Sequence, residues 1–381
     1  MELKQLQEQI RATDIEMSRL FAQRMELSAR LAQTRAAQGL VPLDLAGQRE
    51  AKALFQDQAG DALSGYAGVL YATLQDVAES HQAASLKTEP SDLCARIEKS
   101  LANTAQLFPE KATVACQGVE GAYSQIAADK LFKEARISYV NRFEAVFSAI
   151  ASGFCQYGVL PLENSTAGSV NRIYDLMMEY NFSIVRSVRV KVDHNLMARP
   201  GVKKEDIKEI FSHEQALAQS VEFLKTMPGV KVTVFENTAM AAKMVAESDR
   251  RDIAALSSHA CGQLYGLNTL KADVQDKGNN YTRFICIGKE PEIFPGADRT
   301  SVMLTLSHQP GSLYRVMSRI TALGINLTKL ESRPLPDRDF EFMFYFDLDT
   351  SVYSPQFIQL MGDLEQMCET FRYLGSYSEI V

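Results

Sequence analysis

The first 35 residues carry the pattern that most constrains the fold of this chain. Apolar residues recur every seven positions in two stripes, Leu3, Ile10, Met17 and Leu31, and Leu6, Leu20 and Leu27. This spacing predicts one long helix from about Leu3 to Arg35 with a heptad-like seam. A lone helix of about 50 Å cannot bury such a seam, so we expect two chains to intertwine here. Arg24 interrupts the first stripe, and a charge in a seam needs a partner.

Composition and charge narrow the class of protein. The chain has 381 residues, enough for two or three domains. Its net charge of -7, without a basic patch, argues against a nucleic-acid partner. No apolar run reaches the ~20 residues that span a bilayer, and the N-terminus lacks the apolar core of a signal peptide, so we expect a cytoplasmic protein. The six scattered cysteines indicate reduced, mostly buried thiols and no metal site.

The periodicity changes twice along the chain. Residues 1–86 indicate three helices, of which the second and third cover roughly 47–59 and 66–84, and residues 87–110 are expected to form a linker with a short helix. From 111 to 289, strand-like runs alternate with helical ones, which is typical of an α/β domain. Residues 299–381 follow the order βαββαβ of a ferredoxin-like fold. The fold class is therefore multidomain, an all-α part followed by two α/β parts.

Four polar clusters lie at the ends of predicted strands in the middle domain. They are QGVEGAYS (117–124), PLENSTAGSV (161–170), SHEQALAQS (212–220) and NNYTRF (279–284). A glycine-rich turn can present N–H groups to an anion, although a plain tight turn explains it equally well. Helix capping explains single residues, such as Ser212 with Gln215, but not four consecutive polar residues. For Thr282 and Arg283, an edge-strand threonine and a surface arginine remain the alternative.

The series ENSTAGSV, SHEQALAQS, NTAMAA, CGQLYGL and NYTRF resembles the motif series of prephenate dehydratases. The motifs occur in the family's order and spacing over residues 112–289. The resemblance implies two α/β subdomains, the second at roughly 191–266, arranged as in periplasmic binding proteins with substrate in the cleft. It implies conversion of prephenate to phenylpyruvate, water and carbon dioxide, a lyase reaction that needs no cofactor and no metal.

The resemblance also implies roles for individual residues. Thr282 would assist departure of the ring hydroxyl, Arg283 would hold a carboxylate, and Glu163 would act as an acid or an orienting group. The expected substrate-binding wall comprises Asn164, Ser165, Thr166, Ser212, Gln219, Thr238 and Phe284. Because loss of the two groups restores an aromatic ring, positioning and one good donor suffice.

The stretches PGSLYRVMSRI (310–320) and LESRP (330–334) resemble the signatures of the ACT regulatory domain. The family domain binds phenylalanine at a subunit interface, which implies feedback inhibition in phenylalanine biosynthesis. The implied effector-binding residues are Gly311, Ser312, Leu313, Asn326, Glu331 and Ser332. Ser312 replaces the family's alanine. The alternative is that Gly311 only starts a helix and Glu331 is a surface charge.

Residues 1–86 resemble the all-helical chorismate mutase domain of the bifunctional P-protein, with IRATDIEMSRLFAQRMELSARLAQTR matching its first helix without gaps. Chorismate is a dianion whose rearrangement is accelerated by cations. The implied mutase-like site comprises Arg24, Arg35, Asp44, Arg49, Glu50 and Gln82. Gln7 stands where the family has an arginine, and the register of the second helix has two solutions.

Two alternatives therefore stay open for the helical domain, an active mutase and a retained dimerisation element. The whole chain also has an alternative, a non-catalytic sensor of prephenate or an aromatic amino acid with a helical dimerisation module. In every case we expect a homodimer or a dimer of dimers.

Overall fold

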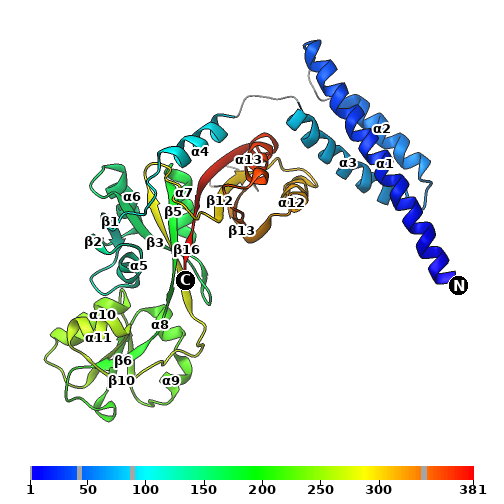
Figure 1. The fold of residues 1–381 in the computed structure, drawn as a ribbon. Coiled ribbons are helices and arrows are strands. Elements are labelled where there is room, and N and C mark those ends of the chain that lie inside the picture. The colour runs from blue at the N-terminus through cyan, green and yellow to red at the C-terminus, as the bar shows by residue number, and fades with distance from the viewer. Residues whose placement is uncertain (1, 41–44, 86–90, 336–340) are drawn as a thin grey trace. The chain divides into compact units, whose positions relative to one another are not determined.

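The computed structural model describes residues 2–40, 45–85, 91–335 and 341–381 (Figure 1). The chain divides into two compact units. The first comprises Met1–Arg96, Thr305–Asn326 and Ser354–Phe371, and the second Ile97–Leu304, Leu327–Tyr353 and Arg372–Val381. No helix in the described ranges combines the length and the apolar character that a membrane span requires.

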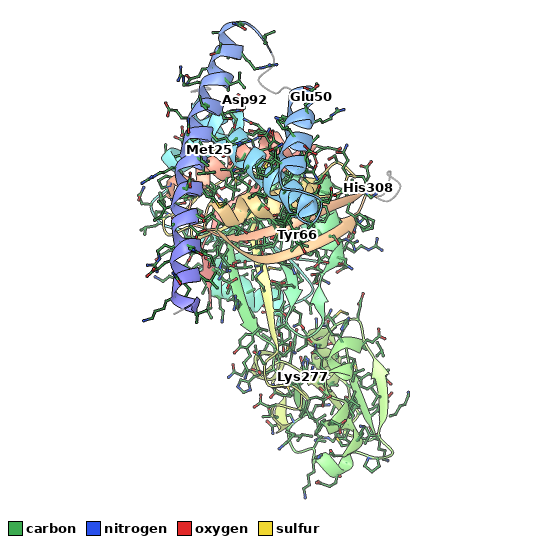
Figure 2. All side chains as sticks on the ribbon, turned by 90° about the vertical axis from the view of Figure 1, so that its right-hand side faces the viewer. Met25, Glu50, Tyr66, Asp92, Lys277 and His308 are labelled. Atoms are coloured by element: carbon green, nitrogen blue, oxygen red, sulfur yellow. The ribbon has the colours of Figure 1, made fainter. Side chains whose placement is uncertain are left out.

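Helices form the first unit. They are α1 (Glu2–Ala37), α2 (Leu45–Gln58), α3 (Ser64–Ser85), α12 (Ser312–Ala322) and α13 (Pro355–Met367). The long first helix confirms the heptad-based prediction. Its inner side buries Met25, which Figure 2 labels, with Ala29 and Ala32. The seam residues stay exposed within one chain, for example Leu20 at 58%. An exposed seam of this length supports the expectation of a second chain.

Polar contacts join α3 to α12 and α13 inside the first unit. The Arg319 guanidinium donates to the carbonyl oxygen of Asp76 at 2.9 Å and lies 3.1 Å from Asp363 Oδ2. Ser80 Oγ donates to the same carboxylate at 3.4 Å. These contacts join helices from the two ends of the sequence within the first unit.

The second unit is built on a mixed sheet in the order β16-β5-β11-β3-β1-β2, with β4 beside β3. Its strands are β1 (Lys111–Gln117), β2 (Glu134–Val140), β3 (Tyr157–Asn164), β4 (Gly168–Ser169), β5 (Ser183–Lys191), β11 (Tyr281–Gly288) and β16 (Glu379–Ile380). The associated helices are α4 (Asp92–Asn103), α5 (Tyr123–Leu131), α6 (Phe143–Ala151) and α7 (Asn171–Glu179). The five longer strands lie in the range 111–289, where strand-like runs were predicted, whereas the two-residue β4 and β16 were not predicted.

A five-stranded sheet in the order β10-β6-β9-β7-β8 forms the second lobe. Its elements are β6 (Asn195–Ala198), η1 (Lys204–Asp206), β7 (Glu209–Ser212), α8 (Glu214–Ala218), α9 (Val221–Lys225), β8 (Lys231–Val234), α10 (Thr238–Glu247), β9 (Ile253–Ser257), α11 (His259–Tyr265) and β10 (Asn268–Lys271). The chain enters this lobe after β5 and leaves it before β11. Two chain segments therefore connect the lobes, the arrangement of a hinged cleft.

A four-stranded sheet in the order β13-β14-β12-β15 follows. Its strands are β12 (Arg299–Thr305), β13 (Asn326–Pro334), β14 (Phe342–Asp349) and β15 (Thr370–Tyr377). With α12 and α13 they give the predicted order βαββαβ. Gly375 on β15 has φ +141°, and a Cβ there would lie 2.2 Å from the carbonyl oxygen of Ile184. This close approach of two backbones requires a glycine.

Candidate active site

A cavity of about 600 Å³ lies between the two lobes of the second unit and is lined by both. Among its walls are five residues predicted to bind or transform a substrate, Asn164, Gln219, Thr238, Thr282 and Phe284. Thr166 lines an adjoining pocket of about 320 Å³ near Lys277, which Figure 2 labels. Residues that are more than 100 positions apart in the sequence therefore meet around one space.

Thr282 and Asn164 face each other across two paired strands. β11 runs antiparallel to β3, and the register places Thr282 opposite Asn164. Asn164 Nδ2 donates to Thr282 Oγ1 at 2.9 Å and to Asn280 Oδ1 at 2.8 Å. Its Oδ1 accepts from the N–H of Thr166 at 3.0 Å and from the hydroxyl of the same residue at 2.7 Å. Both amide atoms of Asn164 are fully engaged, so its orientation is fixed.

Gln219 carries this network to the second lobe. Its Nε2 donates to Thr166 Oγ1 at 2.8 Å, and its Oε1 accepts from Asn280 Nδ2 at 2.9 Å. His194 Nε2 lies 2.9 Å from the same Oε1 and therefore donates to it. Burial lowers the pKa of His194, which favours the neutral ring. Sequence reasoning missed His194 and Asn280 as site residues, although Asn280 lies inside a quoted motif.

The hydroxyls of two predicted substrate-binding residues, Ser212 and Ser165, form hydrogen bonds with backbone groups. Ser212 is buried, and its hydroxyl donates to the carbonyl oxygen of Leu256 at 2.7 Å, which fastens β7 to β9. Ser165 Oγ donates to the carbonyl oxygen of Asn279 at 3.0 Å and accepts from the N–H of Tyr281 at 2.9 Å. In this geometry both hydroxyls hold the strands that carry the cleft residues.

Arg283, predicted to hold a substrate carboxylate, lies behind the cleft and pairs with two carboxylates of the protein, those of Asp347 and Glu163. Adjacent residues of a strand point to opposite faces, so Thr282 and Phe284 line the cleft while Arg283 points behind it. Its Nη2 donates to Asp347 Oδ2 at 2.5 Å. Burial lowers the pKa of the guanidinium, but the surrounding phenols and carboxylates, Tyr377 and Asp347 first, more than offset this and raise it. Its carboxylate partners are thus residues of the protein.

Glu163, predicted to be an acid or an orienting group, lies opposite Arg283 behind the cleft. Its Oε1 lies 3.1 Å from Arg283 Nε, and its Oε2 accepts from Lys329 Nζ at 2.5 Å. Lys329 also lies 3.7 Å from Glu331, whose Oε2 accepts from the Ser169 hydroxyl at 2.6 Å. Glu163 can orient neighbouring groups here but does not line the cleft as an acid.

The N-terminal ends of two helices, α5 and α10, lie at the cleft wall. Gln117, Gly118, Tyr123 and Ser124 of the glycine-rich turn line it, and α5 begins there at Tyr123. Asn237 Oδ1 caps α10 by accepting from the N–H of Met240 at 2.7 Å, and Thr238 follows at the cleft wall. The N-termini of α5 and α10 therefore supply positive electrostatic potential to a cavity whose described lining contains no Lys or Arg.

The predicted effector residues divide between the units. In the first unit, Gly311 has φ +88° and caps α12, and Ser312 is buried with its Oγ 3.1 Å from Ser307 Oγ. Leu313 is half-buried on α12, and Asn326 is exposed at the start of β13. In the second unit, β13 carries Glu331 in the charged cluster behind the cleft and an exposed Ser332.

The predicted mutase-like residues are partly brought together in the first unit. Arg24 donates to the carbonyl oxygen of Leu74 at 3.0 Å and to Gln75 Oε1, and its guanidinium lies over the Tyr71 ring. Gln82 Nε2 donates to Ser28 Oγ at 2.5 Å.

Arg35 of the mutase-like set is half-buried on α1, whereas Arg49 and Glu50 on α2 are exposed, as Figure 2 shows for Glu50. The α2 side chain that reaches α3 is Gln48, which donates to Glu79 Oε1 at 3.2 Å. Asp44 lies outside the described residues. Arg24 thus faces neutral groups of its own chain.

Comparison with known proteins places this geometry in a family. A family model described as prephenate dehydratase matches residues 114–292. The chain is 37% identical over 284 residues to arogenate dehydratase/prephenate dehydratase 1 of Arabidopsis thaliana, a match that spans 70% of this chain and 72% of that protein.

Two solved structures share the fold. A prephenate dehydratase from Arthrobacter aurescens in complex with L-Phe gives a TM-score of 0.64 at 27% identity, covering 70% of this chain and 89% of that one. A protein described as a quorum-quenching acylase gives 0.64 at 30% identity, covering 70% and 97%. The extent of the sequence identity and the family match over both lobes show that the chain belongs to the prephenate dehydratase family.

Proposed function

We propose that this chain is a dehydratase that aromatises prephenate, or its amino counterpart arogenate, by loss of carbon dioxide and water. The observation that carries the proposal is the hydrogen-bond chain that ends on the Thr282 hydroxyl in the cleft. The names of the family's relatives supply the two candidate substrates. Both substrates have the same ring and differ only in a keto or an ammonium group on the side chain.

The network leaves the proton of Thr282 available. Asn164 Nδ2 is a donor, so Thr282 Oγ1 accepts this bond, and no acceptor within the described residues takes its own hydrogen. A hydroxyl that accepts one hydrogen bond becomes a stronger donor of another. As the bond between the ring and the carboxylate carbon breaks, its electron pair enters the ring and the C–O bond opposite breaks. Thr282 then donates its proton to the departing hydroxide, which leaves as water, and the threonine oxygen regains a proton from solvent water, so that hydroxide is released to the solvent.

The cleft can hold the substrate's carboxylates without a cationic side chain. Because Arg283 is engaged behind the cleft, the N-termini of α5 and α10 take the part that sequence reasoning gave to it. Helix dipoles can stabilise the side-chain carboxylate, which the product keeps. They bind the ring carboxylate less strongly than a full positive charge would, so that this group can leave as neutral carbon dioxide.

The test compares Thr282→Val with Thr282→Ser in the full chain. Product formation from supplied prephenate and arogenate would be followed at saturating substrate, with folding checked by circular dichroism. Valine keeps the shape but removes the donor, so we expect kcat to fall about 10²- to 10⁴-fold, while serine stays within about tenfold. Full activity of the valine variant would refute the role of Thr282. Wild-type protein that binds prephenate without turnover would favour the sensor alternative.

The proposal includes feedback by phenylalanine. It is supported by the effector motifs and by the L-Phe complex of the Arthrobacter relative. Phenylalanine at a regulatory site lowers activity only if it binds the less active arrangement more tightly. Dehydratase activity would therefore be titrated with phenylalanine, and inhibition that cannot be overcome by saturating substrate is the expected result.

For the helical region we propose assembly as the primary role. Arg24 is satisfied by α3, Arg49 and Glu50 are exposed, and the apolar seam of α1 is uncovered within one chain. Leu20→Arg should shift the sedimentation of the chain towards the monomer. A separate assay of chorismate loss decides whether mutase activity remains. Measurable turnover would show that the present cations suffice without an arginine at Gln7.

A further inference from the structure

We propose that Asp347 on β14 is a positioning residue for the cleft hydroxyl of Thr282, acting through Arg283. This inference rests on the proposed dehydratase function and adds a link between the four-stranded sheet and the active site. Thr282 and Arg283 are neighbours on β11, so whatever fixes the guanidinium also fixes the strand that presents the hydroxyl.

The anchor at Asp347 is rigid and buried. Asp347 is 1% exposed, and its two carboxylate oxygens have different partners. Oδ2 accepts from Arg283 Nη2 at 2.5 Å, and Oδ1 accepts from the Ser301 hydroxyl at 2.5 Å. Ser301 is itself held by the hydroxyls of Tyr345 at 2.9 Å and Tyr377 at 2.7 Å. A buried carboxylate with every oxygen engaged cannot move independently of its sheet.

The strand between anchor and cleft has little freedom to absorb a shift. β11 lies between β5 and β3 in the sheet, and its register against β3 changes between Arg283 and Phe284. Such a shift in register changes the direction of the side chains that flank it. Thr282 is paired with Asn164, and the next pair along the two strands is Arg283 with Glu163, which lies on the side away from the cleft.

The second member of the rear pair is also held by the four-stranded sheet. Lys329 on β13 donates to Glu163 Oε2 at 2.5 Å and to Ser169 Oγ at 3.1 Å. The same Ser169 hydroxyl donates to Glu331, in the predicted effector motif. Lys329 on β13 therefore holds Glu163, the neighbour of Asn164, and Asp347 on β14 holds Arg283, the neighbour of Thr282. A rearrangement of the four-stranded sheet would therefore be transmitted to the cleft through both of these contacts.

A neighbouring ion pair provides a matched control. Arg333 on β13 binds Asp175 on α7 at 3.1 Å, so it joins the same sheet to the same lobe without touching β11 or β3. Asp347→Asn and Asp175→Asn each remove one carboxylate charge and keep the side-chain shape. If docking of the sheet alone matters, the two variants behave alike. If Asp347 positions Thr282, only the first disturbs the chemistry.

The experiment measures kcat and KM of both variants, together with the ¹³C-methyl NMR signal of Thr282, assigned from its loss in Thr282→Val. We expect Asp347→Asn to lower kcat at least tenfold with KM changed less than threefold, and to shift the Thr282 methyl signal. Asp175→Asn should leave kcat within twofold and the signal in place. The double variant Arg283→Met with Asp347→Leu removes both buried charges. Relative to Asp347→Asn, we expect it to recover the free energy of unfolding but not kcat.

An unshifted methyl signal and an unchanged kcat in Asp347→Asn would overturn the positioning role. Equal losses in both variants would overturn it in favour of general docking. If the wild-type chain turns over neither prephenate nor arogenate, the proposed function fails, and the NMR comparison still decides whether Asp347 controls Thr282.

Discussion

Asn164→Asp is the substitution whose consequences the structure specifies most fully. The wild-type amide nitrogen lies within hydrogen-bond distance of three acceptors, Asn280 Oδ1 at 2.8 Å, Thr282 Oγ1 at 2.9 Å and the carbonyl oxygen of Tyr281 at 3.2 Å, and shares its two hydrogens among them. The substitution would place an oxygen against three oxygens. Two lost hydrogen bonds at about 1 kcal/mol each, together with the cost of burying a carboxylate against oxygen atoms, should lower the free energy of unfolding by about 3 kcal/mol or more at pH 7.

The same change alters the chemistry in a pH-dependent way. Once ionised, the introduced carboxylate would accept a hydrogen bond from the Thr282 hydroxyl. That hydroxyl would then no longer donate to the leaving hydroxide, so we expect kcat to fall about 10²- to 10⁴-fold. Burial beside oxygen atoms raises the pKa of the introduced carboxyl above its unfolded value of about 3.9. The folded state then favours the protonated form, so the stability deficit grows as pH rises through the folded pKa and shrinks at lower pH.

The assay is product formation between pH 5 and 8, with urea unfolding at both ends of the range. Asn268→Asp adds the same charge to an exposed position on β10 and serves as the control. The reasoning would be refuted if Asn164→Asp kept kcat within threefold of the wild type at pH 7, or if its stability deficit were independent of pH.

Further predictions concern stability away from the cleft. Hydrogen bonds led by that of Lys231 lower the pKa of Glu209 from 4.5 to about 2. Glu209 therefore stabilises the fold above pH 4.5, and this contribution is lost as pH falls towards 2, so acid titrations of the wild type and Glu209→Gln should converge there. Gly375→Ala would press a Cβ against the carbonyl oxygen of Ile184 and should lower the free energy of unfolding by about 3 kcal/mol, measured by urea unfolding. Gly362→Ala, in open space on α13, should instead raise it by up to about 1 kcal/mol.

The sequence predicted elements well where a pattern extended over many residues. The seam of α1 and the apolar run of β3 have lengths that favour one structure, and both appear where expected. β6 and β16 have four residues and two, too few for a periodicity to emerge. Their existence depends on partners that lie far away in the chain.

The site was predicted in its membership more than in its orientation. The family resemblance of the motifs pointed to Thr282, Asn164 and Gln219, and the structure brings these three residues to one cavity. The alternation of a strand already contained the signal that Arg283 faces away from Thr282. What it could not supply was Asp347, because a partner 64 positions along the chain leaves no local trace. His194 was missed for a similar reason, as it lies between two lobes rather than at the end of a recognised motif.

The position of β11 in the large sheet has a consequence for how the chain is made on the ribosome. This strand lies between β3 and β5, yet it is synthesised after the whole second lobe. A nascent chain that has reached β10 has both neighbours of the central strand but not the strand itself. Until β11 is made, the facing edges of β3 and β5 in the large sheet stay unpaired, whereas the sheet of the second lobe can already form. The cleft hydroxyl arrives with β11, so no partial chain that ends before residue 282 can carry the proposed activity.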